Sequence, residues 1–304
     1  MGVGGAVSGG TCFGFEVRSP LPFNYLRGGA GEPLAIREPS NVAEVTRDDL
    51  VIEWTPTPEL PFHARLYSHE ALFRLWIDGA GWFEVDPEAR AISLPETDNP
   101  VRREERLWGI PAILCFLWRG DLPLHAASVE VDGGAILLCA PRTFGKTTLA
   151  AAFVHQGFRL LSEDVSCVRL NATPSVIPGP AMLRLRRDIA ERLDIPRAHR
   201  VGEPDDRMHL ALDPAQRGNC DPIPIRAVVF LRDGDDEVAL EGARASDAIR
   251  DLWSLSFRLP SDADRARCFA GVTDLVNAAP VWNLSYPRRI HALRAAVERI
   301  ITDA

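Results

Sequence analysis

Short runs in which apolar and polar residues alternate characterise the first part of the chain. Alternation with a period of two places the apolar side chains on one face, which is typical of half-buried β-strands. Between residues 12 and 100 such runs are separated by Pro, Gly and Asp, and the clearest are Leu50–Trp54, His63–Tyr67, Ala71–Ile77 and Trp82–Val85. We therefore predict a β-rich N-terminal domain over residues 12–120. Residues 1–11 are rich in Gly and Ser, which predicts a disordered N-terminus.

The apolar pattern changes at the end of this domain. Arg103–Trp118 has apolar residues three or four positions apart, which predicts one helix that ends at Gly120. Beyond it, two apolar strands flank Asp132-Gly133-Gly134, a good hairpin signal. The expected strands are 125–131, 135–139, 158–161, 165–170, 175–177, 208–212, 226–231 and 282–284, and the expected helices are 147–155, 187–193, 245–255, 262–278 and 289–302. This mixture predicts an α/β core domain over residues 121–304.

Composition and charge narrow the classes of protein that fit the chain. Hydrophobic residues make up 46% and charged residues 25% of the 304 residues, enough for a substantial core. The net charge is −8 and the basic residues are scattered, so we expect no nucleic-acid partner. No apolar run approaches the roughly 18 residues of a membrane-spanning helix, and the N-terminus lacks the pattern of a signal peptide. Six single cysteines without a CxxC pair predict buried free thiols in a cytoplasmic protein, whose homo-oligomeric state stays open.

Lysine usage singles out one position. Lys146 is the only lysine of the chain, and it lies in a Gly-Lys-Thr triplet, whereas Arg supplies the other permanently basic side chains. A compact ammonium on a flexible stem can curl over phosphate oxygens, which a planar guanidinium does less well. The lone lysine therefore marks a phosphate site independently of any motif.

The segment around Lys146 has the order of a phosphate-binding loop. An apolar strand at 135–139 precedes it, a helix follows, and the spacing matches GxxxxGK[ST] except that Ala replaces the first Gly. We name residues Ala140, Pro141, Arg142, Thr143, Phe144, Gly145, Lys146, Thr147 and Thr148 the phosphate loop. A helix N-terminus favours phosphate, Lys146 would contact the β- and γ-phosphates of ATP or GTP, and the Thr147 hydroxyl would bind Mg²⁺. A chance turn, or a loop impaired by Ala140, is the alternative.

Two adjacent carboxylates lie downstream of the loop. Glu163 and Asp164 separate two predicted strands, and one could bind Mg²⁺ while the other accepts a hydroxyl proton. The residues alone leave open which of the two binds Mg²⁺ and which accepts the proton. The alternative is an ordinary solvated turn, for which Ser-Glu-Asp is a common composition. His125 begins the strand before the loop strand, where a structural role is the simpler interpretation. The remaining histidines lack ligand spacing, so we expect no zinc site.

Together these segments resemble the catalytic core of the HPr kinase/phosphorylase superfamily. The resemblance rests on Leu124–Val129, the phosphate loop, and Gly157–Asp164, in the family's order and spacing. It extends weakly to Pro178–Leu185 and to Pro280–Leu284 before a final helix. It implies a kinase core of the phosphoenolpyruvate-carboxykinase-like type, with Lys146 and Thr147 at the phosphates and Mg²⁺, Asp164 as base, and His125 as a further site residue.

The sequence also departs from the family's pattern. Ala140 replaces a Gly, Arg142-Thr143-Phe144 replaces a small Ser-Gly segment, and Glu163 replaces the first Asp of the pair. The family's HPr-recognition signature does not follow the core. The resemblance therefore implies an acceptor other than HPr, as in the related kinases of gene clusters for ribosomally made peptides.

The residues support two classes of function. The first is an ATP- and Mg²⁺-dependent kinase whose acceptor is a Ser or Thr of a peptide or small protein, with a small-molecule hydroxyl as a variant. The second is a nucleotide-sensing module without phosphoryl transfer. The acidic pair favours transfer, since a sensor needs no base. No dedicated pocket for a metabolite is evident, whereas the N-terminal strands and the Arg-dense stretch Arg184–Arg200 could hold a partner chain. The alternative is that Arg184, Arg186 and Arg187 line the triphosphate or lie on a solvated helix.

Overall fold

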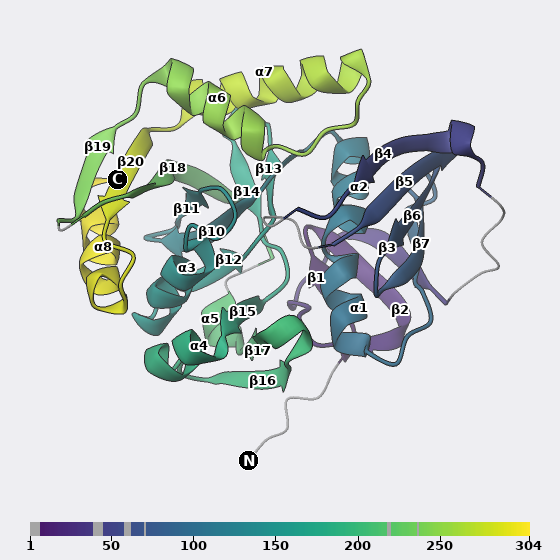
Figure 1. Ribbon diagram of the computed structural model, residues 1–304, viewed down its shortest axis with the longest axis horizontal. Helices are drawn as coiled ribbons and strands as arrows, with labels where there is room; N and C mark the ends of the chain where they lie inside the picture. Colours follow the sequence, from purple (N-terminus) through teal and green to yellow (C-terminus); the bar gives the residue numbers. More distant parts are fainter. Residues whose placement is uncertain (1–6, 39–44, 58–61, 70, 218–219, 236) are drawn as a thin grey trace.

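A large β-sheet fills the N-terminal part of the protein. The structure, a computed structural model, describes residues 7–38, 45–57, 62–69, 71–217, 220–235 and 237–304 (Figure 1). The sheet has eight strands in the order β1-β2-β3-β8-β7-β6-β5-β4. They are β1 Val7–Cys12, β2 Phe15–Phe23, β3 Glu32–Arg37, β4 Leu50–Trp54, β5 Ala64–His69, β6 Leu72–Ile77, β7 Gly81–Asp86 and β8 Ala91–Ser93, with a 3-10 turn at Arg47–Asp49. The four strands predicted between residues 50 and 85 are confirmed.

The first strand corrects the prediction of disorder at the N-terminus. Residues 7–11, expected to be disordered, belong to β1 and pair antiparallel with β2. The backbones of Thr11 and Arg27 exchange hydrogen bonds of 2.7 and 2.9 Å, and the Cys12 side chain is fully buried. Strand pairing with β2 and burial near Cys12 thus order residues 7–11 in spite of their Gly-rich composition. Residues 1–6 lie outside the described part of the chain.

Two helices replace the single helix predicted at Arg103–Trp118. They are α1 Pro100–Leu107 and α2 Ile110–Arg119. The break follows from Gly109, which is the N-cap of α2, and from Pro111, which fits the first turn of a helix but lacks the N–H that a helix interior needs. Both helices pack against the N-terminal sheet (Figure 1), and the break leaves Trp108 at their junction.

The C-terminal part is built on a nine-stranded sheet with a separate three-stranded sheet beside it. The larger sheet contains β9 Leu122–Leu124, β10 Ala126–Val131, β11 Gly134–Cys139, β12 Arg159–Ser162, β13 Ser166–Arg169, β14 Ser175–Ile177, β18 Ile223–Asp233, β19 Ala239–Gly242 and β20 Val281–Tyr286. The smaller sheet contains β15 Met182–Arg186, β16 Ala198–Gly202 and β17 Arg207–Leu212. The helices are α3 Lys146–His155, α4 Arg187–Leu193, α5 Pro214–Arg217, α6 Ala245–Leu255, α7 Asp262–Ala278 and α8 Ile290–Asp303, with a 3-10 turn at Pro204–Asp206. The predicted helices and strands of this part are confirmed, whereas β9, β15, β16, β19 and α5 had no clear sequence signal.

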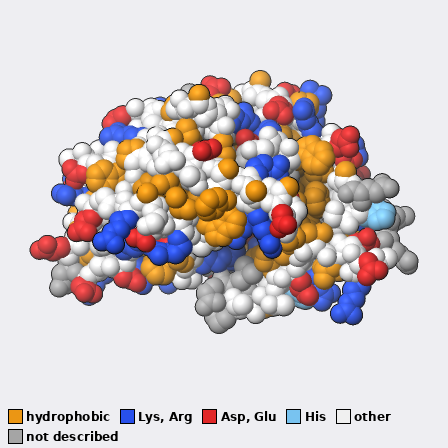
Figure 2. Space-filling model, turned by 90° about the horizontal axis from the view of Figure 1, so that it is seen from above, with side chains coloured by type: hydrophobic (Ala, Val, Ile, Leu, Met, Phe, Trp, Pro, Cys, Tyr) orange, Lys and Arg blue, Asp and Glu red, His pale blue; other side chains and the backbone are white. Residues whose placement is uncertain are grey.

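Helices cover both faces of the larger sheet, as the α/β prediction requires. On one face, α3, α4 and α8 enclose a core that includes Leu138, Phe153 and Val297, and on the other α6 and α7 enclose a core that includes Leu137 of β11 and Val272 of α7 (Figure 1). Leu137 and Leu138 are neighbours on β11, so alternate residues of one strand serve opposite cores. The outer surface of α6 and α7 is mixed, with hydrophobic groups among charged ones (Figure 2).

The hairpin between β10 and β11 is confirmed. Val131 pairs with Gly134, and the two turn residues Asp132 and Gly133 have φ values of 49° and 77°. Positive φ at both central positions is the geometry for which Asp-Gly is favoured. The hairpin fixes β11 in register, and therefore the point at which the phosphate loop leaves the sheet.

The prediction that the cysteines are free thiols is also confirmed. All six cysteines are free, and five of them are buried. None of the described helices is both long enough and apolar enough to cross a bilayer.

Candidate functional site

The phosphate loop leaves the end of β11 and continues into the first turn of α3. Gly145 is the N-cap of α3, with φ 87° and ψ 13°, in the left-handed region that favours glycine. None of the described side chains caps this helix end. Its first N–H groups can therefore bind an anion, and β11, loop and α3 form the strand–loop–helix unit expected from the sequence.

Ala140, the departure from the motif, fits the loop without strain. The non-glycine residues with positive φ in the described chain include Thr143 but not Ala140. The Ala140 side chain is buried, and its carbonyl oxygen accepts a hydrogen bond of 2.7 Å from Lys146 Nζ. The loop conformation therefore tolerates a Cβ at residue 140, and the strained residue is Thr143, at φ 66°.

Replacing Thr143 by glycine is expected to stabilise the protein by about 1 kcal/mol. A left-handed conformation costs a residue with a Cβ roughly 1–2 kcal/mol, part of which is offset by the greater entropy that glycine brings to the unfolded chain. Thr143 is exposed, so little packing is lost. Chemical denaturation measures the change. Thr148→Gly, in the first turn of α3, is the matched control and should destabilise by about 0.3 kcal/mol. Equal losses in both variants would contradict strain at Thr143.

The other loop residues surround the lysine. Pro141 is exposed, and the guanidinium of Arg142 lies 5.6 Å from the centre of the Phe62 ring. Phe144 packs beneath the guanidinium of Arg288, at 4.7 Å. These contacts hold the loop at residues 142 and 144, ahead of Lys146.

Lys146 links the loop to His125. Its Nζ donates to the carbonyl oxygens of Ala140 and Pro141, at 2.7 and 3.1 Å, and lies 2.9 Å from His125 Nε2. Because an ammonium can only donate, Nε2 accepts and a neutral His125 carries its proton on Nδ1. Nδ1 lies 3.4 Å from Asp164 Oδ1. A polar chain therefore runs from the lysine through His125 to Asp164.

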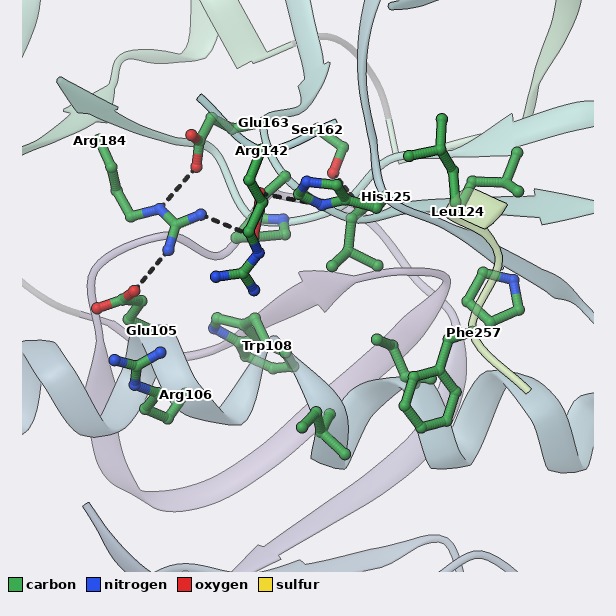
Figure 3. Close-up of a pocket in the computed structure, with 18 of the residues that line it drawn as sticks. Glu105, Arg106, Trp108, Leu124, His125, Arg142, Ser162, Glu163, Arg184 and Phe257 are labelled. Carbon is green, nitrogen blue, oxygen red and sulfur yellow. Dashed lines mark hydrogen bonds and ion pairs between the residues drawn. The ribbon is translucent and has the colours of Figure 1, made fainter. Parts of the chain in front are cut away.

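Glu163 faces the other side of the loop. The Thr147 hydroxyl donates to Glu163 Oε1 at 2.5 Å, and Arg184 Nε donates to Oε2 at 2.7 Å. Arg184 also reaches Asp164 Oδ2 at 3.0 Å and Glu105 Oε1 at 2.5 Å (Figure 3). One guanidinium on β15 thus joins both carboxylates to α1.

Burial and charge set the protonation of these groups. Burial raises the pKa of Glu163, and it lowers the pKa of Lys146 and that of His125, the latter to about 4. Burial also opposes ionisation of Asp164, but Arg184, His125 and Lys146 together outweigh it and hold the pKa of that carboxyl below its usual range. Near neutral pH, Asp164 is therefore ionised and His125 is neutral.

A cavity of about 380 Å³ opens beside Asp164, and we name it the α1–α2 cavity. Its polar end is lined by Glu105, Arg106, His125, Arg142, Glu163, Asp164 and Arg184. Its apolar end is lined by Trp54, Trp108, Ile110, Ile113, Leu124 and Phe257. Figure 3 shows Glu105 and Arg184 at one side and Leu124 and Phe257 at the other, with Trp108 and His125 between them. The volume lies within the range of small-ligand sites.

The oxygen atoms beside the loop fit Mg²⁺. Thr147 Oγ1 and Glu163 Oε1 are 2.5 Å apart at the start of α3. Mg²⁺ is typically held by one or two such protein oxygens together with water and nucleotide phosphates. The described residues contain no cluster of three or more His, Cys, Asp or Glu that could hold a metal by itself.

The structure brings together the residues that the sequence singled out and adds several that it did not. Arg184 begins the Arg-dense stretch Arg184–Arg200, but its own side chain is only 15% exposed and is paired within the site. Glu105 carried no sequence signal, since it lies 79 positions from its partner Arg184. The sequence showed no cluster for a dedicated pocket, because the α1–α2 cavity is formed by segments that are distant in the chain.

Comparison with known proteins adds little to this description. The sequence matches no protein-family model and no curated protein. The solved structures that match include the HPr(Ser) kinase/phosphatase from Coxiella burnetii, with a TM-score of 0.30 and 10% identity over 59% of this chain and 95% of that chain. A superposition at this level says nothing of function, which has to be inferred from the residues of the site.

Proposed function

We propose that this protein is a nucleoside-triphosphate- and Mg²⁺-dependent phosphotransferase that phosphorylates a Ser or Thr hydroxyl of a peptide or small protein. The observation that carries the proposal is the position of Asp164. It lies between the phosphate loop, to which His125 and Lys146 connect it, and the α1–α2 cavity, which it lines. A donor at the loop and an acceptor in the cavity would meet at this carboxylate.

The geometry supports a division of roles between the two carboxylates. Glu163 contacts Thr147, so these two residues would hold Mg²⁺, which neutralises charge on the phosphate oxygens. Both carboxylates line the cavity, but the side chain of Asp164 is 39% exposed and that of Glu163 only 3%, so Asp164 would accept the hydrogen of the acceptor hydroxyl. Lys146 would bind the β- and γ-phosphates, and His125, neutral and held by both neighbours, would position Asp164.

Transfer to the acceptor would form one bond to the γ-phosphorus and break another. The acceptor oxygen bonds to the γ-phosphorus while the bond from that phosphorus to the bridging oxygen breaks, and a nucleoside diphosphate leaves. The hydroxyl proton passes to Asp164. The transition state of phosphoryl transfer is largely dissociative, so the hydroxyl loses its proton late in the reaction. Until then, a carboxylate of low pKa can orient the hydroxyl by accepting a hydrogen bond from it.

Transfer to a hydroxyl is tested with ATP labelled at the γ-phosphate. The full chain is incubated with Mg²⁺, labelled ATP and Ser- or Thr-containing peptides, and the products are analysed by mass spectrometry. We expect the mass of one phosphoryl group on a Ser or Thr. Tight Mg·ATP binding without transfer to any peptide or small alcohol would instead support a nucleotide sensor.

The rate is expected to be nearly independent of pH between about 6 and 8. Burial holds the pKa of His125 at about 4, and Arg184, His125 and Lys146 hold the pKa of Asp164 below its usual range against the effect of burial. Both groups therefore keep their working protonation state across this interval, and activity falls only when Asp164 is protonated at lower pH. The measurement is kcat at saturating nucleotide, Mg²⁺ and peptide. A tenfold loss per pH unit below about 6.5 would instead indicate a base with the pKa of an ordinary histidine.

A further inference from the structure

The α1–α2 cavity is larger than a Ser or Thr side chain requires. The polar end reaches Asp164, but the cavity continues into the apolar end, away from the reacting groups (Figure 3). Trp108 lies at the junction of α1 and α2, and Phe257 follows α6. The N-terminal and the C-terminal part of the protein therefore both contribute to the cavity. A ligand that filled only the polar end would leave this apolar surface facing water.

The apolar end is built to bind an apolar group. The rings of Trp54 and Phe257 stack with centroids 6.0 Å apart and an interplanar angle of 27°. Leu124 is 1% exposed and Ile113 is 6% exposed, so the surrounding wall is packed and not easily rearranged. An apolar compartment offers water few hydrogen-bond partners, and its burial by an apolar side chain is favourable.

The neighbouring strand favours a peptide over a free alcohol as the source of that group. β4 is the last strand of the N-terminal sheet, and within the described residues it pairs with β5 alone. Trp54, the last residue of β4, lines the cavity. Edge strands offer backbone N–H and C=O groups to an extended chain, and a chain added beside β4 would be led to the mouth of the cavity.

We propose that the acceptor is an extended peptide segment whose Ser or Thr reaches Asp164 while a large apolar side chain, two positions away, fills the apolar end against Trp108 and Phe257. The spacing follows from extended geometry, in which side chains two positions apart point to the same side and neighbouring ones point to opposite sides. This inference rests on the proposed kinase function and deepens it by naming the feature that selects the acceptor.

The test uses the full chain with Mg·ATP and a set of blocked heptapeptides. Each has one central Ser among Gly and Ala, with Leu or Phe placed one or two positions before or after it, or with Asp in the same places. We expect kcat/KM to rise about tenfold to a hundredfold when Leu or Phe is two positions from Ser on one side, and to change little at adjacent positions.

Two variants connect the preference to the cavity. Phe257→Ala should remove the preference for Leu or Phe while leaving the KM for ATP unchanged. Phe269→Ala, an exposed aromatic residue of α7 away from the cavity lining, is the matched control and should keep the preference. Preference, not activity, is the readout, so a modest loss of stability in either variant does not confuse the result.

The outcomes separate this inference from the proposed function. Equal phosphorylation of apolar, polar and Asp-containing peptides would overturn the inference and leave the kinase proposal standing. Phosphorylation of a small apolar alcohol such as 2-phenylethanol, with no peptide modified, would overturn the peptide as acceptor. Binding of Mg·ATP without any transfer would overturn both.

Discussion

Replacing Lys146 by alanine is expected to lower phosphoryl transfer by a factor on the order of 10² or more. The ammonium lies within the phosphate loop, only 6% exposed, and is the sole lysine of the chain. Its loss removes a positive charge from the position where charge develops on the transferred group, in surroundings that water does not screen well. Nucleotide affinity, measured by calorimetry with Mg·ATP, should fall as well.

Arginine is not expected to restore function at this position. Nζ lies between His125 Nε2 and the carbonyl oxygens of Ala140 and Pro141, at 2.7–3.1 Å. A guanidinium is larger and planar, and cannot occupy the same space without opening the loop. Arg294→Ala, on the exposed side of α8, is the control for loss of a basic side chain and should leave activity unchanged. Turnover near that of the wild type in Lys146→Arg would contradict the assigned role.

Asp164→Asn is expected to lower kcat by roughly 10²–10⁴ while most Mg·ATP affinity is kept. The amide cannot accept the hydroxyl proton, but it retains the shape of the side chain in the lining of the cavity. Arg184 remains paired with Glu163 and Glu105, so the fold around the site should persist. Calorimetry gives the affinity, and single-turnover kinetics at saturating nucleotide gives the rate of the chemical step.

Glu163→Gln is the informative counterpart, since the two acids are neighbours in the chain. Glu163 contacts Thr147, and its loss should weaken Mg·ATP binding more than it slows transfer at saturation. Asp274→Asn, an exposed acid of α7, is the control for loss of one negative charge. If Asp164→Asn instead abolishes Mg·ATP binding with little further loss of rate, Asp164 is the metal ligand and Glu163 the base.

Much of this site could be predicted from the sequence, because its central unit is local. Apolar residues at 135–139, a loop of fixed length and a helix are consecutive in the chain, so their spacing alone predicts that Lys146 and Thr147 lie at a helix N-terminus. The hairpin at Asp132-Gly133 is local in the same sense, since it depends on the φ angles that these two residues tolerate. The helices of the core were likewise predicted from residues three or four positions apart.

Only the tertiary structure determines which side chains contact the segment formed by β11, the phosphate loop and α3. Arg184 joins Glu163 to Glu105, and no local pattern relates residues that are 79 positions apart. The segment Arg103–Trp118 forms two helices because Gly109 and Pro111 interrupt it, although its apolar periodicity continues through them. This break places Trp108 at the cavity. Residues 7–11 join the sheet because β2 and Arg27 satisfy their backbone. The sequence by itself thus determined the phosphate loop, whose geometry is local, whereas the ion-pair network and the α1–α2 cavity arise from contacts between distant segments, which only packing specifies.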